Sequence, residues 1–233
     1  METKSSKILV IAELGHNFNG NIKLAKKMIE EAKACGADIA KIQLYDTDKI
    51  KKPWQSRYFE LKFSEIDFNE AKEIKEHCDK VGIEFMASAF DTERVEWLEK
   101  LGVKRHKIAS RNIYDKELIR SMEKTGKPII ASLGLYKEDF FPKIKNCDFL
   151  YCVSEYPATI KLKDFPITFN KYNGFSDHTN GMFWAKEAIL RGAKIIEKHF
   201  TLNKSIPGCD QECSAEPVEL RDFIRFVRKI EYE

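Results

Sequence analysis

The chain has 233 residues, of which 43% are hydrophobic and 33% are charged, and it contains only 11 glycines and 7 prolines. This length allows one large domain or two small ones, and the composition excludes collagen, a low-complexity array and a disordered chain. The net charge of +3 is spread along the chain without a basic block, which argues against nucleic acid as a partner.

Short β-type runs alternate with amphipathic runs along the whole chain. The predicted strands lie at 7–12, 39–44, 83–87, 105–109, 128–132, 149–153, 172–176 and 194–200. The predicted helices lie at 22–36, 67–82, 91–102, 114–126, 181–192 and 216–233. Glycine follows several of these helices, as at Gly36, Gly82 and Gly102, and this is a typical helix stop.

Strands that alternate with helices predict parallel βαβ units. Eight units in 233 residues average about 29 residues each, which is close to the roughly 250 residues of a whole TIM barrel. We therefore predict an α/β fold, a (β/α)8 TIM barrel that forms a single domain over residues 1–233. An open doubly wound sheet is the rival fold. The connections at 133–148 and 154–172 have little helical periodicity, so we expect the fifth and sixth helical layers to be reduced.

The sequence contains no apolar run of the roughly 18 residues that a membrane-spanning helix needs. The N-terminal apolar run, ILVIA, is too short for a signal-peptide core. We therefore expect a cytoplasmic protein without a membrane partner. Its six cysteines form no CxxC pair, so they are expected to be reduced thiols. Cys209 and Cys213 are close in sequence, but no second ligand pair accompanies them, which argues against a zinc site.

Polar residues recur where the predicted strands end, which is where chemistry collects in a TIM barrel. They include Glu13, Lys41, Gln43, Ser88, Lys107, Ser110, Ser132, Ser154, Glu155, Tyr156, Ser176, Asp177, His178, Glu197, Lys198 and His199. Burying so many polar groups at one end of a barrel costs stability unless a ligand or a metal pairs with them. We therefore expect these side chains to form a binding site.

Two histidines, His178 and His199, lie at the ends of adjacent predicted strands. Imidazoles that converge there could hold a divalent metal and leave positions open for water or substrate. The alternative is that both are packed histidines that hydrogen-bond within the mouth of the barrel. His16 is a candidate substrate contact, whereas His77 and His106 are expected to be structural.

Lys41 and Lys107 lie inside apolar β runs, where a lysine that faces the interior is costly unless it meets an anion. The alternative is that they point outward, toward a helix interface. Serines stand at four of the neighbouring strand ends, namely Ser88, Ser110, Ser132 and Ser176. Ammonium and hydroxyl groups together can bind a carboxylate and a phosphate. No P-loop or GxGxxG motif is present, so a nucleotide cofactor is not indicated.

Five segments carry a resemblance to a known family: IAELGHNFNG, GADIAKIQLY, KIAS, GFSDHT and IIEKHFTLNKSIPGCDQECSAEP. Over roughly residues 7–225 the chain resembles the sialic acid synthase family, which includes N-acetylneuraminate, legionaminate and pseudaminate synthases. The resemblance implies a TIM-barrel transferase of sialic acid biosynthesis. Such an enzyme condenses phosphoenolpyruvate with an amino-sugar substrate, an N-acetylhexosamine-type aldehyde, to form a nonulosonic acid and release phosphate. It also implies Mn²⁺ or another divalent cation as cofactor.

The resemblance implies a role for individual residues of this chain. His178 and His199 would be the metal ligands, and Glu13, Lys107, His178 and His199 would be catalytic. Phosphoenolpyruvate would be held by Lys41, Ser88, Lys107, Ser110, Ser132 and Ser176. The sugar would be faced by Glu13, Gln43, Tyr156 and Asp210.

Three departures from the family pattern bear on activity. The family's SGE reads Ser110-Arg111-Asn112 here, its STG reads Ser132-Leu133-Gly134, and its Thr-Asn reads Val153-Ser154. Asn112 thus stands where the family has a glutamate with a proposed acid/base role.

Many family members also carry a C-terminal antifreeze-like domain, whereas this chain ends at Glu233, directly after the predicted barrel. Three explanations of this difference stay open: a single-domain member, a member that works with a separate capping protein, and a truncated chain. A homodimer also stays open as a partner. Three functions stay open as well. They are an active synthase, a non-catalytic or repurposed barrel that binds a sugar or phosphate ligand, and a different metal-dependent aldol chemistry at the same mouth.

Overall fold

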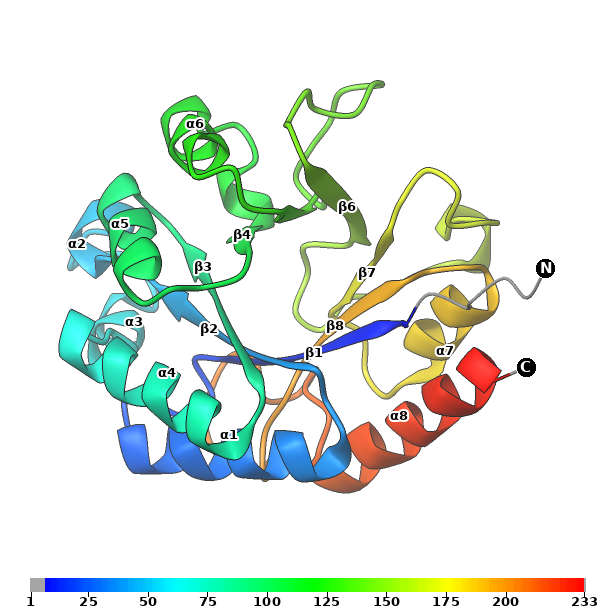
Figure 1. Cartoon of the computed structure of the whole chain (residues 1–233), viewed down its shortest axis with the longest axis horizontal. Coiled ribbons are helices and arrows are strands. Elements are labelled where there is room, and N and C mark those ends of the chain that lie inside the picture. The colour runs from blue at the N-terminus through cyan, green and yellow to red at the C-terminus, as the bar shows by residue number, and fades with distance from the viewer. Residues whose placement is uncertain (1–6, 233) are drawn as a thin grey trace.

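The structure is a computed structural model that describes residues 7–232, so residues 1–6 and 233 of the predicted domain lie outside it. Eight strands form one closed parallel barrel in chain order, and β8 pairs with β1 (Figure 1). The strands are β1 (Leu9–Gly15), β2 (Ile39–Leu44), β3 (Glu84–Ala89), β4 (His106–Ile108), β5 (Ile129–Ser132), β6 (Cys147–Cys152), β7 (Gly174–Asp177) and β8 (Ile195–His199). The prediction of a (β/α)8 barrel is confirmed, and the open sheet is excluded.

Six of the helices match the predicted ones. These are α1 (Ile22–Cys35), α4 (Phe68–Val81), α5 (Thr92–Lys100), α6 (Lys116–Lys124), α7 (Phe183–Leu190) and α8 (Pro217–Tyr232). The local signals account for their ends: Asp67 caps α4 through a capping box with Glu70, and Gly36 ends α1 at a φ of 97°. The sequence does not predict two short helices in the loop after β2, α2 (Thr47–Ile50) and α3 (Tyr58–Ser64).

The helical layer is thin on one side of the barrel. Within the described residues no helix lies between β5 and β6, and only the short 3-10 helix η2 (Leu162–Asp164) lies between β6 and β7. Figure 1 shows extended loops beside β6, whereas α1, α4 and α8 lie along the far side of the barrel. Aromatic packing takes the place of a helix here, as where Phe141 stacks on Phe149 of β6 with ring centroids 5.3 Å apart. The predicted reduction of the fifth and sixth helical layers is confirmed.

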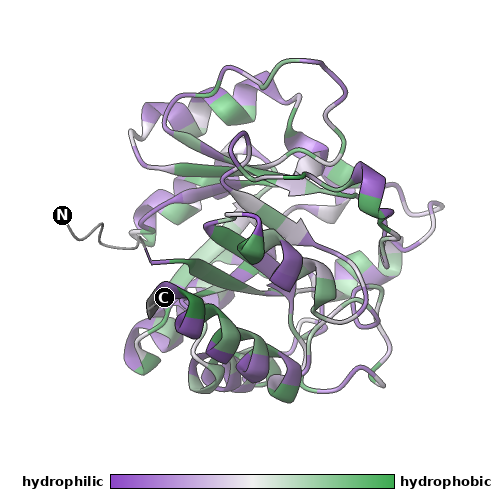
Figure 2. Cartoon of the chain, turned by 90° about the vertical axis from the view of Figure 1, so that its right-hand side faces the viewer, coloured by the Kyte–Doolittle hydropathy of each residue, from purple (hydrophilic) through white to green (hydrophobic). Residues whose placement is uncertain are grey.

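Apolar side chains fill the space between the strands and the helices. Helix α1, for example, buries Ala25, Met28, Ile29 and Ala32 on one face. Figure 2 shows the same pattern, with apolar strands inside and helices that carry both polar and apolar residues. No helix within residues 7–232 is both long and apolar enough to span a membrane.

A second apolar layer fills the inside of the barrel near the amino-terminal ends of the strands. It consists of Ile11, Ile39, Met86, Ile130, Leu150 and Ile195. Because side chains alternate along a strand, the residue two positions after each of these also faces inward. That rule places Glu13, Lys41 and Ser88 inside the barrel, one layer closer to the carboxyl ends of the strands.

Candidate active site

Four charged side chains lie inside the barrel directly above its apolar layer. Lys41 Nζ is 2.6 Å from Glu13 Oε2 and 3.7 Å from Glu197 Oε2. Lys107 Nζ is 3.6 Å from Glu197 Oε1. All four side chains are buried, and the two positive charges are balanced by the two negative ones. Both lysines therefore point into the barrel, and neither lies at a helix interface.

Serine hydroxyls accompany these charges. Lys41 Nζ donates to Ser88 Oγ at 3.2 Å, and Lys107 Nζ donates to Ser132 Oγ at 2.7 Å. Ser176 Oγ donates to Glu197 Oε1 at 2.9 Å. Ammonium and hydroxyl groups thus stand side by side, which is a donor set suited to a phosphate or a carboxylate.

The two lysines differ in how well their charge is compensated. Burial lowers the pKa of Lys41, but Glu13 and Glu197 outweigh burial and raise it above its ordinary value. Burial also lowers the pKa of Lys107, and there Glu197 compensates only in part. Glu197 stays ionised: burial raises its pKa, but Lys107 and Lys41 bring it down to about 2. Lys107 is therefore the lysine that an anionic ligand would stabilise most.

His178 and His199 lie next to each other at the mouth, with ring centroids 5.5 Å apart. The Nδ1 of His178 lies 2.7 Å from the carbonyl oxygen of Val153, so Nδ1–H donates and the lone pair lies on Nε2. Burial, reinforced by His199, lowers the pKa of His178 to about 3, which keeps its ring neutral. A neutral imidazole with a fixed tautomer is the ligating form for a metal.

His199 has fewer hydrogen-bond partners than His178. Its Nδ1 is buried and has no hydrogen-bond partner among the described residues, and the nearest carboxylate oxygen, Asp210 Oδ2, is 3.8 Å away. Tyr156 stacks on His178 at 4.1 Å and meets His199 edge-on at 5.8 Å. Two adjacent imidazoles are nitrogen donors of the kind that divalent transition metals bind. Within residues 7–232 no third His, Cys, Asp or Glu side chain joins them in a group that could hold a metal ion.

The loop after β8 brings Asp210 to the histidines. Asn17, in the loop after β1, donates through Nδ2 to the carbonyl oxygen of Phe200 at 2.9 Å and to Ser214 Oγ at 2.8 Å. Ser214 Oγ in turn donates to the carbonyl oxygen of Asp210 at 2.6 Å. These bonds tie the two loops together and fix Asp210 beside His199.

A cavity of about 400 Å³ opens above this layer. Its wall consists of His16, Gln43, Ile50, Lys51, Arg57, Leu61, Phe90, Ala109, Ser110, Arg111, Leu135, Ser154, Tyr156 and Asp210. Ser110 is already engaged there, because its Oγ accepts from the backbone N–H of Leu135 at 2.7 Å and from Ser154 Oγ at 3.0 Å. The volume falls within the range of small-molecule sites.

The residues with a predicted individual role all lie at this mouth, in two connected groups. Asp177 and Lys198, which were also expected in the site, instead pair with each other at 3.1 Å, and neither they nor Glu155 lines the cavity. The inner group contains Glu13, Lys41, Ser88, Lys107, Ser132 and Ser176, and the outer group contains Gln43, Ser110, Tyr156, His178, His199 and Asp210. His16 also lines the cavity. His106 and His77 lie elsewhere, paired with Glu99 at 3.0 Å and with Glu30 at 3.1 Å. The functional roles of the grouped residues remain predictions.

Glu197, which lies between the two lysines, was expected at the mouth from the sequence, but no individual role was predicted for it. The period of two could have shown that it faces inward, because Glu197 is two residues before the inward-facing His199 on β8. Asn112, which stands where the family has glutamate, does not line the cavity, and its Oδ1 is buried without a hydrogen-bond partner among the described residues.

A closed parallel barrel with polar residues at the carboxyl ends of its strands is the architecture of TIM-barrel enzymes. The chain belongs to the NeuB family, whose model matches residues 28–233. This confirms the resemblance to sialic acid synthases.

Two relatives and one solved structure illustrate this membership. The N,N'-diacetyllegionaminic acid synthase of Campylobacter jejuni is 34% identical over 97% of this chain and 77% of its own. An uncharacterized protein of Methanocaldococcus jannaschii is 36% identical over 98% of this chain and 72% of its own. A crystal structure of an N-acetylneuraminic acid synthetase from Leptospira borgpetersenii, in complex with citrate, superimposes with a TM-score of 0.89. It is 29% identical and covers 98% of this chain and 85% of that one.

Proposed function

We propose that this protein condenses phosphoenolpyruvate with an N-acetylhexosamine-type aldehyde to form a nonulosonic acid, with release of phosphate. In this reaction C3 of phosphoenolpyruvate forms a bond to the aldehyde carbon. Water then adds at C2, and the bond between C2 and the phosphate oxygen breaks. Membership of the NeuB family supports this reaction class.

One observation carries the proposal: two buried lysines, each hydrogen-bonded to a serine, lie in the same mouth as two adjacent histidines. Lys107 and Ser132 are suited to hold phosphate oxygens, and Lys41 with Ser88 is suited to hold the carboxylate. Binding an anion there would stabilise both ammonium groups, whose carboxylate partners among the described residues are Glu13 and Glu197.

A divalent cation fits His178 and His199, because the Val153 carbonyl fixes the tautomer of one ring and the other has a buried nitrogen without a partner. When bound, the cation would supply a Lewis acid for the carbonyl oxygen of the acceptor. Tyr156, which stacks on the His178 ring, would contact the acceptor and orient it. Glu13, held by Lys41 and by Gln43 Nε2 at 3.0 Å, is placed to orient hydroxyl groups or to move a proton.

The test is the release of inorganic phosphate from phosphoenolpyruvate with Mn²⁺ and a panel of N-acetylhexosamines. The proposal requires release that depends on both substrates. Release without an acceptor would indicate simple hydrolysis, and no release with any acceptor would contradict the proposal.

A second function has one observation in its favour. Asn112 cannot act as the acid or base that a glutamate would supply, and it does not face the cavity. A barrel that binds a sugar or phosphate ligand without turnover would still use the two buried lysines to bind an anion. Saturable phosphoenolpyruvate binding by calorimetry, together with no phosphate release across the panel, would favour this function over the synthase.

A further inference from the structure

The entrance to the mouth is more basic than its interior. The cavity wall carries Lys51, Arg57 and Arg111, whereas Asp210 is its one carboxylate. Arg57 Nε lies 3.3 Å from Glu60 Oε2 and is therefore paired. Neither Lys51 Nζ nor the Arg111 guanidinium forms a hydrogen bond or ion pair with another residue in the part of the chain that the structure describes. Two positive charges thus face the cavity uncompensated.

Arg111 is held in place by an aromatic ring and not by a carboxylate. It belongs to the 3-10 helix η1 (Ser110–Asn112), and its Cζ lies 5.1 Å from the centre of the Phe90 ring. Arg111 is an exposed residue, and the partial burial of its guanidinium lowers its pKa. Tyr156 opposes that effect, and no carboxylate within residues 7–232 does so. A guanidinium in this state would be stabilised by an anion brought in by a ligand.

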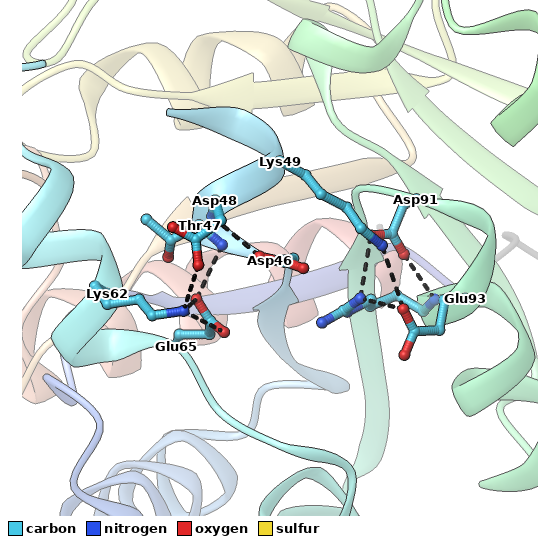
Figure 3. Close-up of polar contacts among 9 residues, drawn as sticks. Asp46, Thr47, Asp48, Lys49, Lys62, Glu65, Asp91 and Glu93 are labelled. Carbon is cyan, nitrogen blue, oxygen red and sulfur yellow. Dashed lines mark hydrogen bonds and ion pairs between the residues drawn. The ribbon is translucent and has the colours of Figure 1, made fainter. Parts of the chain in front are cut away.

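Lys51 differs from Lys49 and Lys62, two other lysines of the segment that carries it. Figure 3 shows Lys49 reaching Asp91, at 3.1 Å, and Lys62 reaching Asp48, at 3.0 Å. These contacts anchor the segment to the start of α5 and to itself, which positions Lys51 at the cavity wall. Lys49 and Lys62 are thus paired with acidic residues of this chain, and Lys51 is not.

We propose that Arg111 and Lys51 bind a phosphate monoester on the acceptor, so that the substrate is a phosphorylated N-acetylhexosamine. This inference rests on the proposed function and names the substrate class of the same site. The planar guanidinium can hold two phosphate oxygens at once, and the ammonium adds a point charge. A phosphate monoester carries about −1.5 to −2 charges at neutral pH, which matches these two cations.

The position of the two cations favours the acceptor over phosphoenolpyruvate as the ligand. Lys41 and Lys107 belong to the inner group, and neither lines the entrance cavity. Arg111 and Lys51 share the cavity wall with Phe90 and Leu61, on the solvent side of that inner group. A first substrate held by the inner lysines leaves the cavity to the second. The acceptor would then direct its aldehyde toward the histidines and its far end toward Arg111.

The experiment compares each N-acetylhexosamine of a panel with its own 6-phosphate, and follows the loss of phosphoenolpyruvate by ultraviolet absorbance. We expect kcat/KM to be at least about tenfold higher for the phosphorylated acceptor than for the unphosphorylated one. A hydrogen bond to a charged group has an effect of about this size. Arg111→Ala should remove about tenfold to a hundredfold of kcat/KM for the phosphorylated acceptor only. The kcat/KM of Arg111→Lys for the phosphorylated acceptor should fall between those of the wild type and Arg111→Ala. The lysine keeps the positive charge but loses the contact with two phosphate oxygens.

Arg225→Ala is the matched control, because it also removes one positive charge, from an exposed pair with Asp222 on α8. It should change neither acceptor's kinetics. Equal or better turnover of the unphosphorylated acceptor would overturn the inference and leave the proposed function intact. A rise in the KM for phosphoenolpyruvate in Arg111→Ala, with the acceptor KM unchanged, would also overturn it and assign Arg111 to the other substrate.

If no acceptor is turned over, the proposed function fails and binding decides the inference alone. Calorimetric titration of an N-acetylhexosamine 6-phosphate into the wild type and Arg111→Ala then gives the answer. Binding that is at least about tenfold weaker in the variant supports the phosphate site. Equal binding, or none by the wild type, overturns it.

Discussion

Near the amino-terminal ends of its strands the barrel interior is filled with aliphatic side chains, whereas two residues further along the same strands it holds lysines, glutamates and serines. Leu150 on β6 and Ile130 on β5 belong to the first layer, and Lys41 and Lys107 belong to the second. Both layers are buried and come from the same alternation of side chains. The difference teaches that burial alone does not separate residues that stabilise the fold from residues that bind.

Burial stabilises the two layers to different extents. Burying aliphatic groups is favourable in proportion to the area removed from water. Burying ion pairs roughly breaks even, and an apolar replacement of such a pair is often neutral or stabilising. The charged layer is therefore not explained by stability, which is why the mouth reads as a functional site. Three predictions test this division, from the largest expected effect to the smallest.

Leu150→Ala should be the most damaging change to stability. The side chain is fully buried in the lower layer, so the loss of its methyl groups and the cavity left behind should lower the free energy of unfolding by about 2–5 kcal/mol. Urea denaturation measures this effect. The affinity for phosphoenolpyruvate should change little, since Leu150 belongs to the apolar layer and carries none of the charged or hydrogen-bonding groups of the mouth. A large loss of affinity in a protein that still folds would show that the two layers are not separable.

Removing either mouth histidine should affect metal uptake more than stability. His178→Ala or His199→Ala should weaken Mn²⁺ binding at least about 10–100-fold, because even the loss of a group supporting a metal ligand has that effect. Electron paramagnetic resonance during a Mn²⁺ titration measures it.

His106→Ala is the matched control for the metal prediction, since His106 is also a buried strand histidine but pairs with Glu99 on the outside of the barrel. It should lose stability and keep Mn²⁺ uptake. Equal uptake by all of these proteins would mean that the mouth histidines are packed side chains and not ligands.

Gly15→Ala should give the smallest effect. Gly15 ends β1 with a φ of +51°, and a Cβ there would lie 3.2 Å from Asp210 Oδ2 and 3.3 Å from His199. Backbone strain should cost about 1–2 kcal/mol in thermal unfolding. The crowding should in addition weaken Mn²⁺ binding. Gly102→Ala controls for strain, because its φ of +69° is similar and a Cβ would meet nothing within 4 Å. Identical Mn²⁺ binding by the two variants would show that crowding at Gly15 does not affect the metal site.

The sequence predicted most of the fold because the strands are apolar runs bounded by glycines and helix caps. β2 matches its predicted range, 39–44, since all of its residues but one are buried. β1 runs past its predicted end to Gly15, because Glu13 pairs with both β2 and β8 even though a glutamate is atypical of a strand. Helices α2 and α3 escaped prediction, since short helices over residues 47–64 carry no periodic apolar pattern.

The site residues that lie on strands were predictable from the alternation of side chains along each strand. Lys41 and Lys107 followed from their place inside apolar runs, and Glu197 was within reach of the same rule. The entrance was not predictable, because Lys51 and Arg111 come from loops whose paths depend on tertiary contacts such as the Lys49–Asp91 pair. No pattern in the sequence brings those two residues to one cavity.

The central claim is that the charged layer of the barrel binds phosphoenolpyruvate. Calorimetric titration of phosphoenolpyruvate into the wild type, Lys107→Met and Lys41→Met tests it most directly, with Lys49→Met as a control for the loss of a surface lysine. The account predicts saturable binding by the wild type and the control. It predicts no measurable binding by either mouth variant while each remains folded at the titration temperature. Each change removes one partner of a buried ion pair and should therefore also lower the thermal unfolding midpoint. Unchanged affinity in Lys107→Met would contradict the account.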